Sequence, residues 1–171
     1  MQALLKAFWD IALLRRDPGH LPDSGTLVGV CALAYAALSA VQSWMLTGSD
    51  RLFARTLADL ALLVLLVWLL LAATGRSNRL KQTLGAVLGT GALLSPLVIL
   101  LLALRGPAEA NHGIALVVWA GSVAVILWYT FILGHIVRSA LDTGWFTGVA
   151  IAITYVVASA ALLTRIFPES G

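Results

Sequence analysis

The first candidate for chemistry is a carboxylate inside an apolar segment, Asp59, with Arg55 four residues before it. On a helix these two side chains share one face. Gln42, near the end of the preceding apolar segment, is expected at a similar depth. An ionisable group at the centre of a membrane helix costs about 2.5–3.5 kcal/mol, so it deserves a functional hypothesis. The sequence allows a proton or cation site here, or an ion pair near the headgroups that fixes helix depth. The lack of a second acid or histidine at this depth favours the ion pair.

A second candidate group is basic and lies at the ends of apolar segments. His135 and Arg138 are three residues apart, which brings them together on a helix. With other basic residues on the same side of the membrane they could bind an anionic lipid or a phosphate. The alternative, which we favour, is that they only reach toward the membrane edge. The candidate set for anionic-lipid contact is Arg15, Arg16, Arg76, Arg79, Lys81, His135 and Arg138.

Other kinds of chemistry lack a pattern in this sequence. The three histidines, His20, His112 and His135, are expected on alternating sides of the membrane, so they cannot form one metal site. Cys31 is the single cysteine and is expected to be a packing residue. No nucleophile, zinc-protease or phosphate-loop motif is present, and no clustered basic face suggests nucleic acid. We therefore expect no enzymatic activity, no catalytic or metal-binding residue, and no cofactor.

Five long apolar segments must position these side chains. The chain has 171 residues, of which 60% are hydrophobic and 11% charged, more apolar surface than a soluble domain can hide. A bilayer core about 30 Å thick needs roughly 20 apolar residues per helix. The sequence therefore predicts an all-α membrane protein with five transmembrane helices. Residues 26–171 are expected to form the bundle, with spans at 26–47, 56–74, 83–104, 113–137 and 143–164.

Residues 1–25 are expected to form a short amphipathic helix followed by a Pro/Gly turn. The helix is too short to cross the bilayer, so it should lie in the interface or against the bundle. Asp23 or Ser24 could cap the first span. Phe8 and Trp9 should enter the interface or the bundle, and they are the first candidates for contact with a partner.

Small residues and a proline predict how the spans pack. Gly85–Gly89 and Gly144–Gly148 are G-x-x-x-G patterns, which let helix backbones approach closely in lipid. Pro96 follows Ser95 in the middle of the third span and is expected to kink it. We interpret the kink as shaping the bundle more than serving as a gate.

The layout resembles the small bacterial members of the Yip1-domain family. The resemblance rests on the N-terminal "LLRRDPGHLPDS", on five spans with tight loops, and most strongly on "VVWAGSVAVILWYTFILGHIVRSALDTGWFTGVAIAITYVVASA". It implies a multi-pass protein of the bacterial inner membrane and carries over no catalytic residue. Counting basic residues in the short loops gives seven on the N-terminal side and four on the other. This balance favours a cytoplasmic N-terminus and a periplasmic C-terminus.

Three functions are compatible with these features. The leading hypothesis is a scaffold, assembly factor or accessory subunit of a membrane complex, with the lipid bilayer and copies of itself or other membrane subunits as partners. The second is a small transporter or channel, which requires Gln42, Asp59, Ser95 and His135 to face one cavity. The third is a lipid-handling protein, with lipid bound near the basic loops. Asp59 and His135 are expected in opposite leaflets and out of contact.

Overall fold

The structure, a computed structural model, describes residues 2–48 and 52–167, and this part of the chain is helical with no strand. Five of its helices are long and apolar enough to cross a membrane, which confirms the predicted class. A short helix precedes them, also as predicted. The elements are α1 (Gln2–Ala12), η1 (Pro18–His20), α2 (Gly25–Thr47), α3 (Leu52–Ala73), η2 (Ser77–Arg79), α4 (Leu80–Ala103), α5 (Arg105–Ala110), α6 (His112–Leu141) and α7 (Trp145–Ile166).

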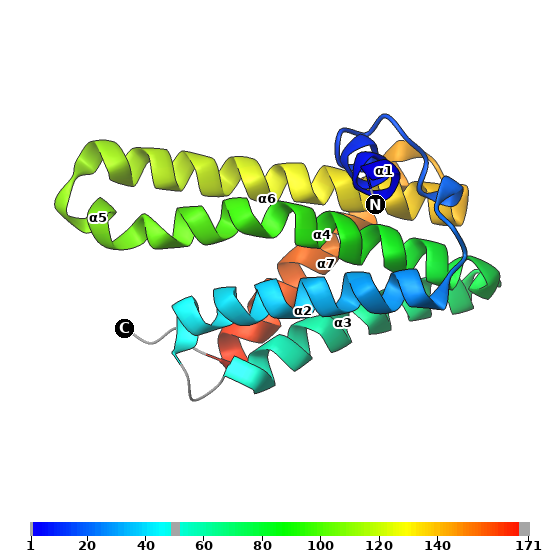
Figure 1. Cartoon of the computed structure of the whole chain (residues 1–171), viewed down its shortest axis with the longest axis horizontal. Helices are drawn as coiled ribbons and strands as arrows, with labels where there is room; N and C mark the ends of the chain where they lie inside the picture. Colours follow the sequence, from blue (N-terminus) through cyan, green and yellow to red (C-terminus); the bar gives the residue numbers. More distant parts are fainter. Residues whose placement is uncertain (1, 49–51, 168–171) are drawn as a thin grey trace.

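Helices α2, α3, α4 and α6 run roughly lengthwise, α7 crosses them at an angle, and the two ends of the bundle differ (Figure 1). One end carries η1, η2 and the turn between α6 and α7, and α1 lies across the bundle near it; we call it the α1 end. The opposite end carries α5, which joins α4 to α6; we call it the α5 end. There the α4–α5–α6 hairpin projects beyond α2 and α7 (Figure 1).

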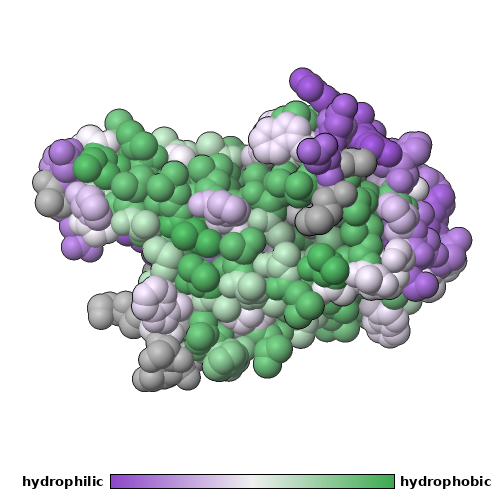
Figure 2. Space-filling model, in the orientation of Figure 1, coloured by the Kyte–Doolittle hydropathy of each residue, from purple (hydrophilic) through white to green (hydrophobic). Residues whose placement is uncertain are grey.

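The apolar core lies at the α1 end. The buried residues of α4 fall mostly in its first half, between Thr83 and Gly91, and those of α6 mostly in its second half, between Thr130 and Leu141. Around the bundle, the helices follow one another in the order α3, α2, α4, α6 and α7, and α7 also contacts α3. Helix α7 packs on α6 at the α1 end through Gly148, and its C-terminal end meets the start of α3, where Arg55 Nη1 donates to the Phe167 carbonyl oxygen. Figure 2 shows an indentation in the outline between the projecting hairpin and α2.

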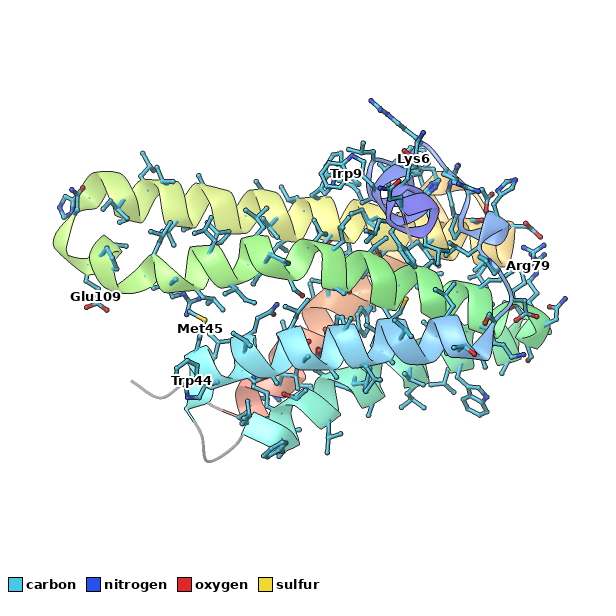
Figure 3. The ribbon with its side chains drawn as sticks, viewed as in Figure 1. Lys6, Trp9, Trp44, Met45, Arg79 and Glu109 are labelled. Carbon is cyan, nitrogen blue, oxygen red and sulfur yellow. The ribbon has the colours of Figure 1, made fainter. Side chains whose placement is uncertain are left out.

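The first G-x-x-x-G pattern seats α1 on α4. A Cβ at Gly89 would lie 2.3 Å from Cε1 of Phe8, so only glycine leaves room for the ring. Phe8 is 7% exposed and Ile11 is fully buried. Trp9 is 55% exposed and points away from the bundle together with Lys6 (Figure 3). Phe8 is thus an internal packing residue and not a surface for a partner, because its ring fills the Gly89 notch; of the two candidates only Trp9 is accessible.

Local signals fix the helix ends and the course of α4. Ser24 is the N-cap of α2, since its Oγ accepts a hydrogen bond from the Leu27 amide at 3.4 Å. Helix α4 continues through Pro96 without a break. Pro96 lacks the amide that would bond the carbonyl four residues earlier. The kink itself stays a prediction.

Candidate functional site

Asp59 lies inside α3 and is held by hydroxyl groups from α2. Because α3 begins at Leu52 rather than at residue 56, Asp59 is about two turns into the helix, one turn deeper than predicted. Its carboxylate accepts a hydrogen bond of 2.7 Å from the Tyr35 hydroxyl. The Ser39 hydroxyl also hydrogen-bonds to it. Both donors satisfy the carboxylate without neutralising it.

The structure brings together the three polar residues that the sequence placed at one depth. Asp59, Arg55 and Gln42 line one cavity of about 130 Å³. The positive charge of the Arg55 guanidinium interacts electrostatically with the Asp59 carboxylate. The Nη1 of Arg55 donates to the carbonyl oxygen of Phe167 at 3.2 Å, just beyond the end of α7. Arg55 therefore caps a helix C-terminus, where a cation is favourable.

Three tyrosines surround the carboxylate, and sequence reasoning missed them. Tyr35 of α2, Tyr129 of α6 and Tyr155 of α7 line a cavity of about 340 Å³ together with Asp59 and Gln42. Each tyrosine stands ten to twelve residues from the α1 end of its own helix, or about 15–18 Å along the axis. That common depth, close to the middle of a bilayer, is the signal that could have found them.

A third cavity, of about 180 Å³, continues the second toward α4 and is mostly apolar. It shares Tyr35, Gln42 and Tyr129 with the larger cavity. Gly91 of α4 leaves room for the Tyr35 ring, because a Cβ at Gly91 would lie 2.8 Å from Cε2 of Tyr35. We call the three adjoining cavities the Asp59 cleft. Its other lining residues include Ser39, Ser43, Leu94, Ser95, Val98, Val125, Ile126, Ser159 and Leu163.

His135 lies outside this cleft and is buried, so it neither contacts lipid headgroups, as the candidate set supposed, nor reaches toward the membrane edge, the alternative we favoured. Its side chain is 5% exposed. Its Nε2 lies 3.1 Å from the carbonyl oxygen of Arg16, and because a carbonyl only accepts, Nε2 carries the proton. The segment between α1 and η1 folds over the imidazole, a tertiary contact that residue spacing does not reveal. A transporter path through Gln42, Asp59, Ser95 and His135 therefore keeps only its first three residues.

The other basic candidates are in three different situations. Arg76 and Arg79 reach across from η2 and its N-cap to form ion pairs with Asp142, the second at 3.0 Å. The Arg138 guanidinium lies 5.4 Å from the centre of the Trp145 ring, within cation–π range. Arg15, Arg16 and Lys81 are exposed and accessible to anionic headgroups, and Lys81 Nζ also lies 3.7 Å from Asp23 Oδ1.

Asp142 joins the α6–α7 turn to the α3–α4 turn. It is the C-cap of α6, in the left-handed region with φ 46°, a conformation that Asp and Asn tolerate. The hydrogen bond from Arg79, and to a smaller extent the one from Arg76, lowers the pKa of the Asp142 carboxyl below the ordinary 3.8. A depressed pKa in the folded state means that the ionised form stabilises the fold above the ordinary pKa. This contribution is lost as pH falls through the folded-state pKa.

Replacing Asp142 with asparagine should therefore make unfolding less dependent on acid. Asn keeps the left-handed cap but loses both ion pairs. We expect wild type to be more stable than Asp142→Asn at pH 7, and the gap to close as pH falls below the ordinary carboxyl value of 3.8. Unfolding midpoints in detergent across this pH range measure it. A gap of equal size at both ends of the range would contradict the role assigned to the carboxylate.

A polar pocket of about 320 Å³ at the α1 end is built from groups that satisfy one another. Asp17 accepts hydrogen bonds from the Ser139 hydroxyl at 2.5 Å and the Gly19 amide at 2.7 Å. Partial burial acts to raise the pKa of Asp17, but these two hydrogen bonds and the nearby histidines outweigh it and lower the pKa. The contacts fasten η1 to α6, which gives this pocket a structural explanation.

The fold and the Asp59 cleft define an α-helical multi-pass membrane protein with a polar site inside its spans. The chain matches no protein-family model, no curated protein and no solved structure.

Proposed function

We propose that this protein is a small non-enzymatic membrane carrier that binds a cation in the Asp59 cleft. The observation that supports this most is a carboxylate within a span that faces a cavity of about 340 Å³. Ionisable residues inside membranes commonly mark a solute or ion path. Pockets of roughly 300–1,000 Å³ are the size that small molecules occupy.

The lining groups favour a positive charge. Among the described residues that line the cleft, Asp59 is the only acidic one, and its hydrogen-bond donors are hydroxyls, which leave its charge in place. Aromatic rings attract cations, and three tyrosines line the same cavity. Arg55 also lines the cleft, but its Nη1 donates a hydrogen bond to the Phe167 carbonyl oxygen at the end of α7. The site therefore combines a carboxylate with aromatic groups, a pattern suited to an ammonium or alkali cation.

The orientation is part of the proposal. The excess of basic residues near the α1 end favours that end in the cytoplasm, so the cleft would open to the outside of a bacterial inner membrane. The five-span layout and the short N-terminal arm also support the Yip1-like family as a proposal.

A second candidate function is that of a scaffold or accessory subunit. The projecting α4–α5–α6 hairpin favours it, since Leu116 and Trp119 on α6 are both 66% exposed there. These side chains could contact lipid, a second copy or another membrane subunit. Photo-crosslinking from position 116 would test this candidate: a defined protein adduct supports it, and adducts with lipid alone contradict it.

Thiol reagents of opposite charge test the cation preference. We start from Cys31→Ala, which removes the only cysteine, and add Ser159→Cys in the cleft wall. The thiolate itself reacts faster with a cationic reagent, so the rate ratio of the trimethylammonium-ethyl to the sulfonatoethyl thiosulfonate is compared with that of an exposed control, His112→Cys. The ratio at Ser159→Cys should exceed the ratio at His112→Cys at least about tenfold, because the carboxylate attracts the first reagent and repels the second. Equal ratios at the two positions would contradict the proposal.

A further inference from the structure

We propose that the cation is amphipathic: an ammonium head on a hydrocarbon chain, drawn from the membrane. This inference rests on the proposed cation site and adds the chemistry of the rest of the ligand. It starts from the unequal lining of the Asp59 cleft. Asp59, Ser39 and Ser43 line one arm, and Leu94, Val98, Val125 and Ile126 line the other.

The polar and apolar arms meet at shared residues. Tyr35 and Gln42 line all three cavities, so the arms are continuous. The Tyr35 hydroxyl donates a hydrogen bond to Asp59, and the Tyr35 ring packs against Gly91 of α4. A ligand whose charge lies at Asp59 can therefore extend past Tyr35 into the apolar arm.

The apolar arm reaches the surface that faces lipid. Ile126 lines it and is 53% exposed, and its neighbour Leu127 on α6 is 54% exposed. A small hydrophilic cation gains nothing from this arm, whereas a hydrocarbon chain gains about 0.8 kcal/mol for each methylene removed from water. The composition of the cleft thus matches a single-chain amine or quaternary ammonium better than a free inorganic ion.

The charge of the cleft also argues against an anionic amphiphile. Arg55 is the only basic residue in the described lining, and it donates a hydrogen bond to the Phe167 carbonyl oxygen. An alkyl sulfate or phosphate would place its charge beside Asp59 or would have to displace that hydrogen bond. The head-group specificity is therefore testable with ligands that share one chain.

The test measures protection of Ser159→Cys, in the Cys31→Ala background, from the neutral reagent N-ethylmaleimide. The protein is reconstituted in lipid nanodiscs and mixed with tetramethylammonium, octyltrimethylammonium, octyl glucoside or octyl sulfate. Octyltrimethylammonium should reach half-protection at a concentration at least about tenfold below that of tetramethylammonium. The two other octyl compounds control for partition into the bilayer and should not protect.

A pair of variants tests where the hydrocarbon chain of the ligand lies. Val98→Trp fills the apolar arm and should cut the advantage of octyltrimethylammonium to less than about threefold. Leu97→Trp, on the neighbouring and 45% exposed position outside the cleft, should leave that advantage unchanged. Equal loss in both variants would overturn the placement of the chain.

The outcomes separate this inference from the proposed function. Equal protection by the two ammonium compounds overturns the amphipathic ligand and leaves the cation site standing. Protection by all three octyl compounds shows that only the hydrocarbon matters and overturns both. If neither ammonium compound protects the cysteine, or if N-ethylmaleimide does not react with it, the proposed function itself is overturned.

Discussion

Asp59→Asn is expected to remove the thermal stabilisation that tetramethylammonium gives the wild-type protein. A ligand that binds only the folded state stabilises it by RT ln(1 + [L]/Kd), about 2.7 kcal/mol at a hundred times Kd. Two unit charges 4 Å apart interact by about 4 kcal/mol at an effective dielectric of 20. Losing the carboxylate charge should therefore weaken binding on the order of 100-fold or more. Unfolding temperatures across a series of tetramethylammonium concentrations measure the loss.

The fold should tolerate this change. Asparagine is nearly the same size, and its amide oxygen can still accept the hydrogen bond from Tyr35. We expect the unfolding temperature without ligand to stay within a few degrees of wild type, since no core volume is lost. Asp59→Glu keeps the charge and is the matched control, which should retain most of the stabilisation. Equal stabilisation of Asp59→Asn and wild type would show that the carboxylate does not bind the cation.

Gly148→Leu is expected to separate α6 from α7 and to destabilise the protein by about 3 kcal/mol or more. A Cβ at Gly148 would lie 2.4 Å from the carbonyl oxygen of Gly134 and 3.0 Å from the amide nitrogen of Arg138. These are backbone atoms, so no side-chain rotation can relieve the overlap. The loss would also move Tyr155 of α7 away from Tyr129 of α6 at the cleft.

Gly144→Leu provides the comparison within the same motif. A Cβ at Gly144 meets no atom within 4 Å, so the larger side chain is accommodated. Gly144 is the N-cap of α7, and loss of a glycine there costs about 1 kcal/mol or less. Unfolding by added sodium dodecyl sulfate measures both variants. Similar losses for the two glycines would contradict the assignment of close packing to Gly148 alone.

The sequence predicted the parts of the fold that depend on local pattern. Runs of about 20 apolar residues identified the five spans, because backbone groups in lipid must be satisfied within a helix. Spacing of four placed Arg55 and Asp59 on one face, and depth along the span added Gln42. The glycine pattern at 85–89 predicted close packing, which the structure shows as the seat of Phe8 on Gly89.

The parts that were missed depend on contacts between helices. Tyr35, Tyr129 and Tyr155 were not among the candidates from the sequence, since nothing in a single span shows that three tyrosines converge on one carboxylate. His135 read as a residue at the membrane edge because the segment that covers it comes from over a hundred residues earlier. Arg76 and Arg79 were candidates for lipid contact, but they form ion pairs with Asp142, which lies over sixty residues away and comes close only when α4 and α6 pack.

The most direct test of the central claim, that Asp59 makes the cleft selective for cations, is the ratio of reaction rates of the two charged thiosulfonates at Ser159→Cys, with and without Asp59→Asn. With Asp59 present, the ratio should exceed that of the exposed His112→Cys control at least about tenfold, and Asp59→Asn should lower it to the value of that control. Both proteins should have the same helical content by circular dichroism. A ratio that is unchanged by Asp59→Asn would contradict the account, because the selectivity would then come from another part of the molecule.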